Sequence, residues 1–237
     1  YGTDLYLYNR MEPSIWGANE EFISCPQLDD LQCAYTSLQG FLKGANKQSI
    51  NVFACFDNEE VGSGTKQGAG STFLYDAMRR INNALGKGEE EYYRALASSF
   101  MLSADNAHAV HPNHPAKTDV NNCVYMNEGI VVKSHAGQKY TSDAVSIAVF
   151  KGLCKKAGVP VQFFSNRSDT AGGSTLGNIA MAQVSMNSVD IGLPQLAMHS
   201  SYETAGVKDT AYMIKVMEEF FNSHIEEMSG HILKVTK

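Results

Sequence analysis

The sequence lacks several features that would assign it to common classes of protein. Its 19 basic residues are outnumbered by 25 acidic residues, for a net charge of −6, which argues against a nucleic-acid-binding surface. No apolar run approaches the roughly 18 residues that a membrane-spanning helix needs, so no membrane partner is expected. The start, YGTDLYLYNR, contains neither a methionine nor the pattern of a signal peptide. We therefore expect either a processed N-terminus or part of a longer chain.

The cysteines do not form a recognisable framework. There are five, an odd number, and no two of them make a C-x-x-C pair. This pattern favours reduced thiols in the cytoplasm over disulfides or a structural zinc finger. The chain also has no repeat, low-complexity tract or long linker, and we predict one domain over residues 1–237.

Helical and strand patterns alternate along the chain. Apolar runs predict strands over residues 51–56, 128–135 and 159–165, and helical periodicity predicts helices over 71–86, 88–102, 142–158 and 209–228. Strands separated by helices indicate an α/β layered domain with a largely buried sheet. In such sheets, ligands bind beyond the ends of strands.

Acidic and histidine residues recur just after apolar runs. These are the pair Asp29 and Asp30, the pair Glu59 and Glu60, Asp105, and His199. Carboxylate oxygens and imidazole nitrogens are ligands that zinc accepts. Adjacent carboxylates repel each other, and a dication would neutralise one glutamate while the other acts as a base on metal-bound water. The alternative is that the DNEE stretch is a solvated acidic turn.

Three further histidines are spaced by three residues but are not expected to converge on a metal. Pro112 and Pro115 interrupt any helix that would align His108, His111 and His114. Each is predicted to be a loop residue or to lie behind the direct ligands.

Five stretches resemble, in order, motifs of the aspartyl aminopeptidase family of dinuclear metallopeptidases. They are DNEEVGSGTKQGA, SADNAHAVHPN, VVKSHAGQKY, RSDTAGGSTLG and GLPQLAMHSSYE. The stretch DLYLYNRMEPSIWGANEEFISCPQLDDL is similar to the segment that precedes and contains the family's bridging ligand. The resemblance runs from about Asp4 to Ala211. It implies a mixed, largely buried β-sheet sandwiched between helices, as in zinc exopeptidases.

The resemblance implies a role for each acidic position. Asp29 matches the carboxylate that bridges two divalent metal ions, Glu59 the general base, and Glu60 a ligand of one metal. Asp105 matches a ligand of the other metal, and His199 completes the site that contains Glu60. Zinc is the expected ion, and cobalt and manganese suit the same ligands.

The resemblance also implies a substrate and an assembly. Lys133 and Tyr140 match positions that contact the substrate's side chain or the reacting centre. A lysine there favours peptides with an N-terminal Asp or Glu. The alternatives are that Lys133 is a solvated residue at a strand end and that the enzyme prefers neutral N-terminal residues. Family members form large tetrahedral homo-oligomers. A catalytically silent structural or peptide-binding relative is the other alternative, and the presence of Glu59 argues against it.

The chain departs from the family pattern in three respects. Gln27 stands where the family usually has arginine, and Asp30 where it usually has asparagine, so Asp30 remains an alternative bridge. Nothing in residues 1–237 matches the family's remaining ligand, a histidine in an N-terminal segment, or the inserted dimerisation domain that follows it. We therefore expect the second metal to bind weakly and these residues alone to be a poor enzyme.

Overall fold

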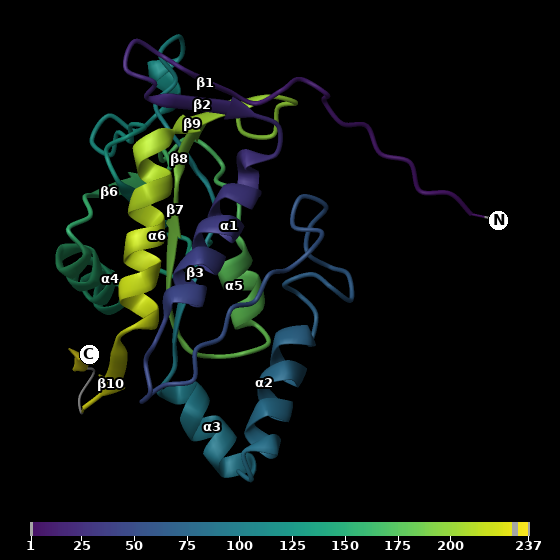
Figure 1. Ribbon diagram of the computed structural model, residues 1–237, viewed down its shortest axis with the longest axis vertical. Helices are drawn as coiled ribbons and strands as arrows, with labels where there is room; N and C mark the ends of the chain where they lie inside the picture. The colour runs from purple at the N-terminus through teal and green to yellow at the C-terminus, as the bar shows by residue number, and fades with distance from the viewer. Residues whose placement is uncertain (1, 229–231, 237) are drawn as a thin grey trace.

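A four-stranded mixed sheet lies at the centre of the computed structural model (Figure 1), which describes residues 2–228 and 232–236. Its strand order is β3 (Phe100–Ala104), β7 (Asn187–Gly192), β5 (Ile130–Ser134) and β6 (Val161–Ser165). The pairs β3–β7 and β5–β6 are parallel, whereas β5 and β7 are antiparallel. The sheet is therefore mixed, as predicted.

A second sheet continues the first. It has the order β1 (Ser14–Trp16), β2 (Phe22–Cys25), β9 (Glu203–Gly206), β8 (Pro194–Leu196) and β4 (Ala107–His108). Only Leu193 separates β7 from β8, and only Asp105 and Asn106 separate β3 from β4. Backbone hydrogen bonds cross this break, from Asp105 N to Ile191 O (3.1 Å) and from Ala107 N to Leu193 O (2.8 Å). We call this junction of the two sheets the seam.

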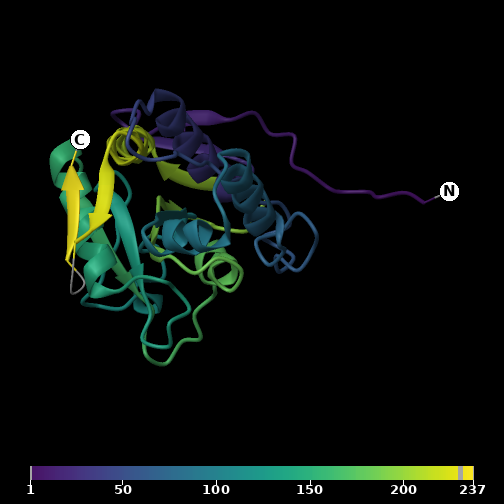
Figure 2. The same cartoon turned by 90° about the horizontal axis from the view of Figure 1, so that it is seen from below.

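Helices cover both faces of the four-stranded sheet. On one face α1 (Leu28–Lys43) and α6 (Val207–Phe221) lie side by side, with α4 (Ala144–Ala157) beside them (Figures 1 and 2). Their apolar side chains pack on alternate strand residues such as Val189 and Ile191. The intervening residue Asp190 faces α5 (Leu176–Met181) on the other side. This arrangement confirms the predicted α/β fold with a largely buried sheet between helices.

Local signals set the bounds of α4. Asp143 accepts a hydrogen bond from Ser146 N (2.7 Å), and Ser146 Oγ accepts one from Asp143 N (3.0 Å), so the two residues cap the start reciprocally. Gly158 ends the helix in the left-handed conformation at φ 65°. The helix predicted over 142–158 is confirmed, and so are the strands predicted over 128–135 and 159–165, which are β5 and β6.

The predicted strand over residues 51–56 is wrong. The segment has no assigned strand, its backbone makes no hydrogen bond with the described residues, and Val52 is 39% exposed. An apolar run becomes a strand only where a neighbour pairs with its backbone. None of the described strands pairs with this segment.

Two predicted helices end earlier than expected. The helix predicted over 88–102 is α3 (Glu89–Ala97), because the following Phe100–Ala104 pairs with β7 instead. The helix predicted over 209–228 is α6, which ends at Phe221. Residues His224–Glu227 then form β10, which pairs with β11 (Leu233–Thr236). Strand pairing outweighs helical periodicity in both places, with a remote strand for Phe100–Ala104 and with the next strand along the chain for His224–Glu227.

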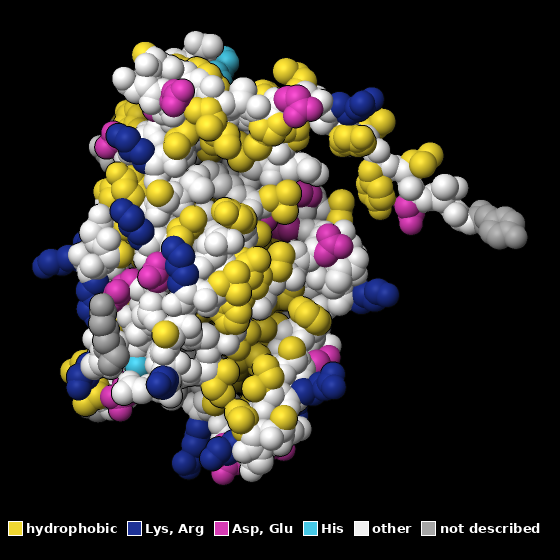
Figure 3. All heavy atoms as spheres, in the orientation of Figure 1, with side chains coloured by type: hydrophobic (Ala, Val, Ile, Leu, Met, Phe, Trp, Pro, Cys, Tyr) yellow, Lys and Arg dark blue, Asp and Glu magenta, His cyan; other side chains and the backbone are white. Residues whose placement is uncertain are grey.

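Two helices expose apolar side chains to solvent. The helix predicted over 71–86 forms as α2 (Phe73–Ala84), but only Leu74 is buried within it, and Phe73 is 51% exposed. On α1 an apolar stripe also faces outward, made up of Leu31, Tyr35, Leu38 and Leu42. Figure 3 shows hydrophobic side chains gathered over this side of the molecule. In the described part of the chain, no helix is both long and apolar enough to span a bilayer.

The close approach of α1 to α6 makes Gly40 a sensitive position. A Cβ atom there would lie 2.8 Å from the backbone of α6, whereas a Cβ at Gly152, on the exposed side of α4, would meet nothing within 4 Å. We expect Gly40→Ala to destabilise the protein by about 1–3 kcal/mol through overpacking. The matched control Gly152→Ala should stabilise it by about 0.5–1 kcal/mol, because alanine favours a helix. Urea unfolding measures both values, and effects of the same sign would contradict this account of the packing.

Candidate metal centre

Three predicted ligands meet at the end of the seam. Asp29 follows β2 at the start of α1, His199 lies between β8 and β9, and Glu60 lies in the loop of residues 57–71. His199 Nε2 is 3.3 Å from Asp29 Oδ2 and 3.4 Å from Glu60 Oε2. One ligand atom from each residue lies within 4.8 Å of the others. This is the geometry of a candidate metal site, and the two exposed members, Glu60 and His199, open it to solvent.

The electrostatics of the cluster fit a cation. The Asp29 side chain is only 4% exposed, and its Oδ1 is buried without a hydrogen-bond partner. Burial, and then the negative charges of Asp105 and Glu60, raise the pKa of Asp29 to about 9. Burial and the charge of Asp105 raise the pKa of Asp30 to about 7. A divalent cation would relieve both the repulsion and the unsatisfied oxygen, and the carboxylate and imidazole donors suit zinc.

Glu59 lies beside this cluster and is partly buried. Its loop folds back on itself through hydrogen bonds from Gly62 N to Glu59 O and from Ser63 N to Asn58 O, each 2.9 Å. Burial, followed by the charges of Asp105 and Glu60, raises the pKa of Glu59 to about 7. A carboxylate with a pKa near neutrality can both accept and return a proton.

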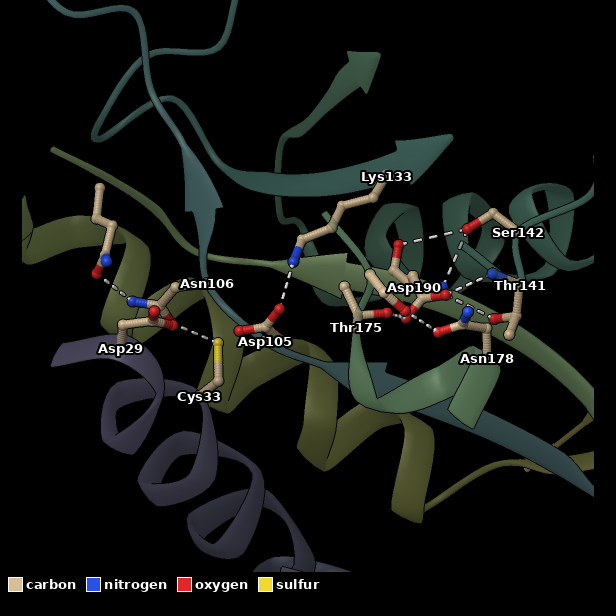
Figure 4. Close-up of polar contacts among 12 residues, drawn as sticks. Asp29, Cys33, Asp105, Asn106, Lys133, Thr141, Ser142, Thr175, Asn178 and Asp190 are labelled. Carbon is tan, nitrogen blue, oxygen red and sulfur yellow. Dashed lines mark hydrogen bonds and ion pairs between the residues drawn. The ribbon is translucent and has the colours of Figure 1, made fainter. Parts of the chain in front are cut away.

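Asp105 occupies the break between β3 and β4 and forms an ion pair with Lys133 (Figure 4). The Nζ–Oδ2 distance is 2.9 Å, and Lys133 is 3% exposed. Burial lowers the pKa of Lys133, but the charge and the hydrogen bond of Asp105, together with Tyr140 and Asp190, raise it overall. The Tyr140 ring lies 5.8 Å from Nζ. The alternative that Lys133 is a solvated strand-end residue is therefore wrong.

The three histidines of the 108–114 stretch do not gather at one point. His108 lies on β4, where burial, then the charges of Lys133 and His199, lower its pKa. The ring centroids of His111 and His114 lie 5.2 Å apart, with the ring planes tilted by 39°, in the loop that follows. Among the described residues, only Asp29, Glu60 and His199 form a group able to hold a metal.

A buried amide network behind Asp29 escaped prediction. Asn106 Nδ2 donates to Gln195 Oε1 (2.6 Å) and to the backbone oxygen of Leu28 (3.2 Å), and Cys33 Sγ donates to Asn106 Oδ1 (2.9 Å). Figure 4 shows this network on the α1 side of Asp105. It ties the residue before Asp29 to the residue after Asp105. Its only sequence signal is the adjacency of Asn106 to a candidate ligand.

Asp190 was also missed. Its carboxylate accepts hydrogen bonds from Thr141 Oγ1 (2.8 Å) and Thr175 Oγ1 (2.7 Å), and it is 1% exposed (Figure 4). Thr141 follows Tyr140, so Asp190 anchors the loop that carries the tyrosine near Lys133. The sequence shows Asp190 only as an acidic residue within a strand. That it is buried becomes clear only when the face of the sheet on which it lies is known.

Comparisons with known proteins give consistent results. The model of the family described as aminopeptidase I zinc metalloprotease (M18) matches residues 1–221. The probable M18 family aminopeptidase 2 of Clostridium novyi is 49% identical over 92% of this chain and 51% of its own length. The chain thus spans about half the length of the curated relatives it matches.

Solved structures show the same similarity. A chain in the cryo-EM structure of the Ape4 and Nbr1 complex is 36% identical, with a TM-score of 0.84, over 90% of this chain and 42% of that one. The S. cerevisiae mApe1 dodecamer is 28% identical, with a TM-score of 0.78, over 90% of this chain and 49% of that one.

When a chelator has removed the metal, the free energy of unfolding should depend on pH through the titration of Asp29. Its folded-state pKa of about 9 exceeds the unfolded value of about 4. The folded protein therefore holds more protons than the unfolded chain between those values, and its free energy of unfolding should fall as the pH rises across this window. Urea unfolding in EDTA at pH 5, 7 and 9 measures the fall. Asp29→Asn should make the fall shallower, mainly between pH 7 and 9, because Asp30 and Glu59 have raised pKa values of only about 7. Zinc should oppose the fall in the parent protein, and an equally steep fall in the variant would refute the assignment.

Proposed function

The chain belongs to the M18 family of aminopeptidase I zinc metalloproteases, and on that premise we propose that it provides the catalytic centre of a metal-dependent aminopeptidase. The reaction is hydrolysis of the first peptide bond, which releases the N-terminal residue. The observation that carries the proposal is the convergence of Asp29, Glu60 and His199 beside Glu59. This set combines ligands for a cation with Glu59, a proton acceptor whose pKa is raised toward neutrality.

The proposed centre holds two divalent cations, with zinc as the expected ion. Asp29, Glu60 and His199 would hold one, and Asp29 and Asp105 would contribute to the other. When bound, such ions polarise a peptide carbonyl and make water a stronger nucleophile at neutral pH. The ion pair with Lys133 uses Oδ2 of Asp105, which leaves Oδ1 for a cation.

Glu59 performs the proton transfers in this proposal. It takes a proton from the attacking water and later returns it to the amine of the leaving peptide. Burial, the largest cause, raises the pKa of Glu59 above its ordinary value, and this brings it closer to a neutral working pH, where general acid–base catalysis is most efficient. Glu60, though adjacent in sequence, points its carboxylate at His199 (3.4 Å), so the two glutamates divide the tasks of binding and catalysis.

The proposed substrates are peptides with an acidic first residue. Lys133 and Tyr140 lie beside Asp105, and a substrate carboxylate reaching Lys133 would gain a charge-assisted hydrogen bond. One observation favours the alternative of a neutral preference: Asp105 already neutralises much of the charge of Lys133. The dodecameric assembly of the S. cerevisiae relative supports a proposed homo-oligomer.

Replacing the proposed base tests the reaction directly. Glu59→Gln should lower kcat by about 10²–10⁴-fold, because the amide cannot accept the proton from water. The zinc content of the variant, measured by elemental analysis, should match that of the parent protein. The control Glu60→Gln should lose zinc as well as activity. Survival of activity in Glu59→Gln would refute the mechanism.

Replacing Lys133 tests the substrate preference. Lys133→Met should lower kcat/KM for a peptide with N-terminal Glu about 10–100-fold more than for one with N-terminal Leu, because a charged hydrogen bond contributes roughly 1.5–3 kcal/mol. The Leu peptide is the internal control for the lost ion pair with Asp105, which affects both substrates. Equal losses would show that Lys133 serves the site without selecting the side chain.

A further inference from the structure

Glu203 joins the backbones of two candidate ligands through one carboxylate. Its Oε2 accepts a hydrogen bond from Asp29 N (2.9 Å), and its Oε1 accepts one from His199 N (2.8 Å). Glu203 is 2% exposed, so water does not compete for these bonds. The same two residues bring their side chains together, with His199 Nε2 and Asp29 Oδ2 3.3 Å apart.

The topology places Glu203 where it can reach both ligands. In the second sheet, β9 lies between β2 and β8. Glu203 is the first residue of β9 and pairs with Cys25, the last residue of β2. Asp29 follows β2 on one side, and His199 belongs to the connection between β8 and β9 on the other. One side chain at this position therefore contacts both connections as they leave the sheet.

Both amides need an acceptor that regular structure does not provide. His199 has a left-handed backbone at φ 66°, and Asp29 has non-helical dihedrals (φ −84°, ψ 116°) within the first turn of α1. Their N–H groups make no backbone hydrogen bond with the described residues. A buried N–H without an acceptor is costly, so Glu203 stabilises these two irregular conformations.

We propose that Glu203 is a positioning residue for the metal centre, holding the backbones of Asp29 and His199 so that their side chains face one cation. The inference rests on the proposed function, because it takes the cluster as a cation site. The role calls for a carboxylate: both of its oxygens accept hydrogen bonds. Glutamine has one acceptor oxygen, and its NH₂ group would face the second N–H as another donor.

Asp209 offers a matched control. It lies in the first turn of α6, is fully buried, and accepts hydrogen bonds from the N–H groups of Asn127 and Gly129. Asp209→Asn therefore disturbs the same kind of paired backbone contact as Glu203→Gln, and because burial raises the pKa of Asp209 to about 7, the two variants are compared above that pH, where both remove a negative charge. Its partners are not candidate ligands, so it separates loss of general stability from loss of ligand position.

The first experiment measures Zn²⁺ affinity of the metal-stripped protein by competition with a chromogenic chelator. Glu203→Gln should weaken affinity about 10–100-fold, as outer residues that orient ligands typically do. Asp209→Asn should leave affinity unchanged, although both variants should unfold at lower urea. Parent-like affinity in Glu203→Gln, or equal weakening in both variants, would overturn the positioning role while leaving the metal site intact. No Zn²⁺ binding by the parent would overturn the proposed function as well.

A second experiment needs no variant. Amide hydrogen exchange of Asp29 and His199 in the parent protein should be slow, because a buried carboxylate accepts both N–H groups. Exchange of either amide at the rate of an exposed loop would overturn the positioning role even if Glu203→Gln does not fold. In a folded Glu203→Gln variant, at least one of the two amides should exchange faster.

Discussion

Mutual repulsion among buried carboxylates is the constraint around which this structure is organised. Asp29, Asp30 and Asp105 converge at the seam, and Glu59 approaches them from the 57–71 loop. Burial and neighbouring negative charge both disfavour ionisation there, which is why the pKa values of Asp29, Asp30 and Glu59 rise. A fold that holds these groups together must supply positive charge or hydrogen-bond donors to each of them.

The seam is the place where the fold can supply those partners. Strands that pass from one sheet into the other leave short irregular stretches, and these carry Asp105 and Asn106. The ammonium group of Lys133 on β5 forms an ion pair with Asp105, and the side-chain amide of Asn106 donates a hydrogen bond to the backbone oxygen of Leu28. Glu203 adds the opposite kind of contact, since its negative charge accepts backbone N–H groups instead of supplying them.

How much could be predicted from the sequence depends on whether the deciding contact is local. The helix over 142–158 was correct to within two residues, because Asp143, Ser146 and Gly158 fix its ends from nearby in the chain. Residues 51–56 failed as a strand because pairing needs a remote neighbour, and no periodicity reveals one. The candidate ligands came from acidic and histidine residues that follow apolar runs, and their roles from motif resemblance. In contrast, Asn106 binds the backbone of Leu28 and Glu203 binds that of Asp29, both far away in sequence. Such contacts leave no local pattern.

The two proposed cation positions are not equivalent in this arrangement. Asp29, Glu60 and His199 form no ion pair with a lysine or arginine in the described chain, and Asp29 keeps a buried oxygen without a partner. Asp105 is already neutralised by a lysine that is itself buried. A cation that binds at the first position reduces the repulsion among carboxylates that have no other positive partner. A cation that binds at Asp105 must share that carboxylate with Lys133. A cation at the first position therefore gains more electrostatic stabilisation. At the second position, binding of a cation is coupled to any other group that pairs with Lys133.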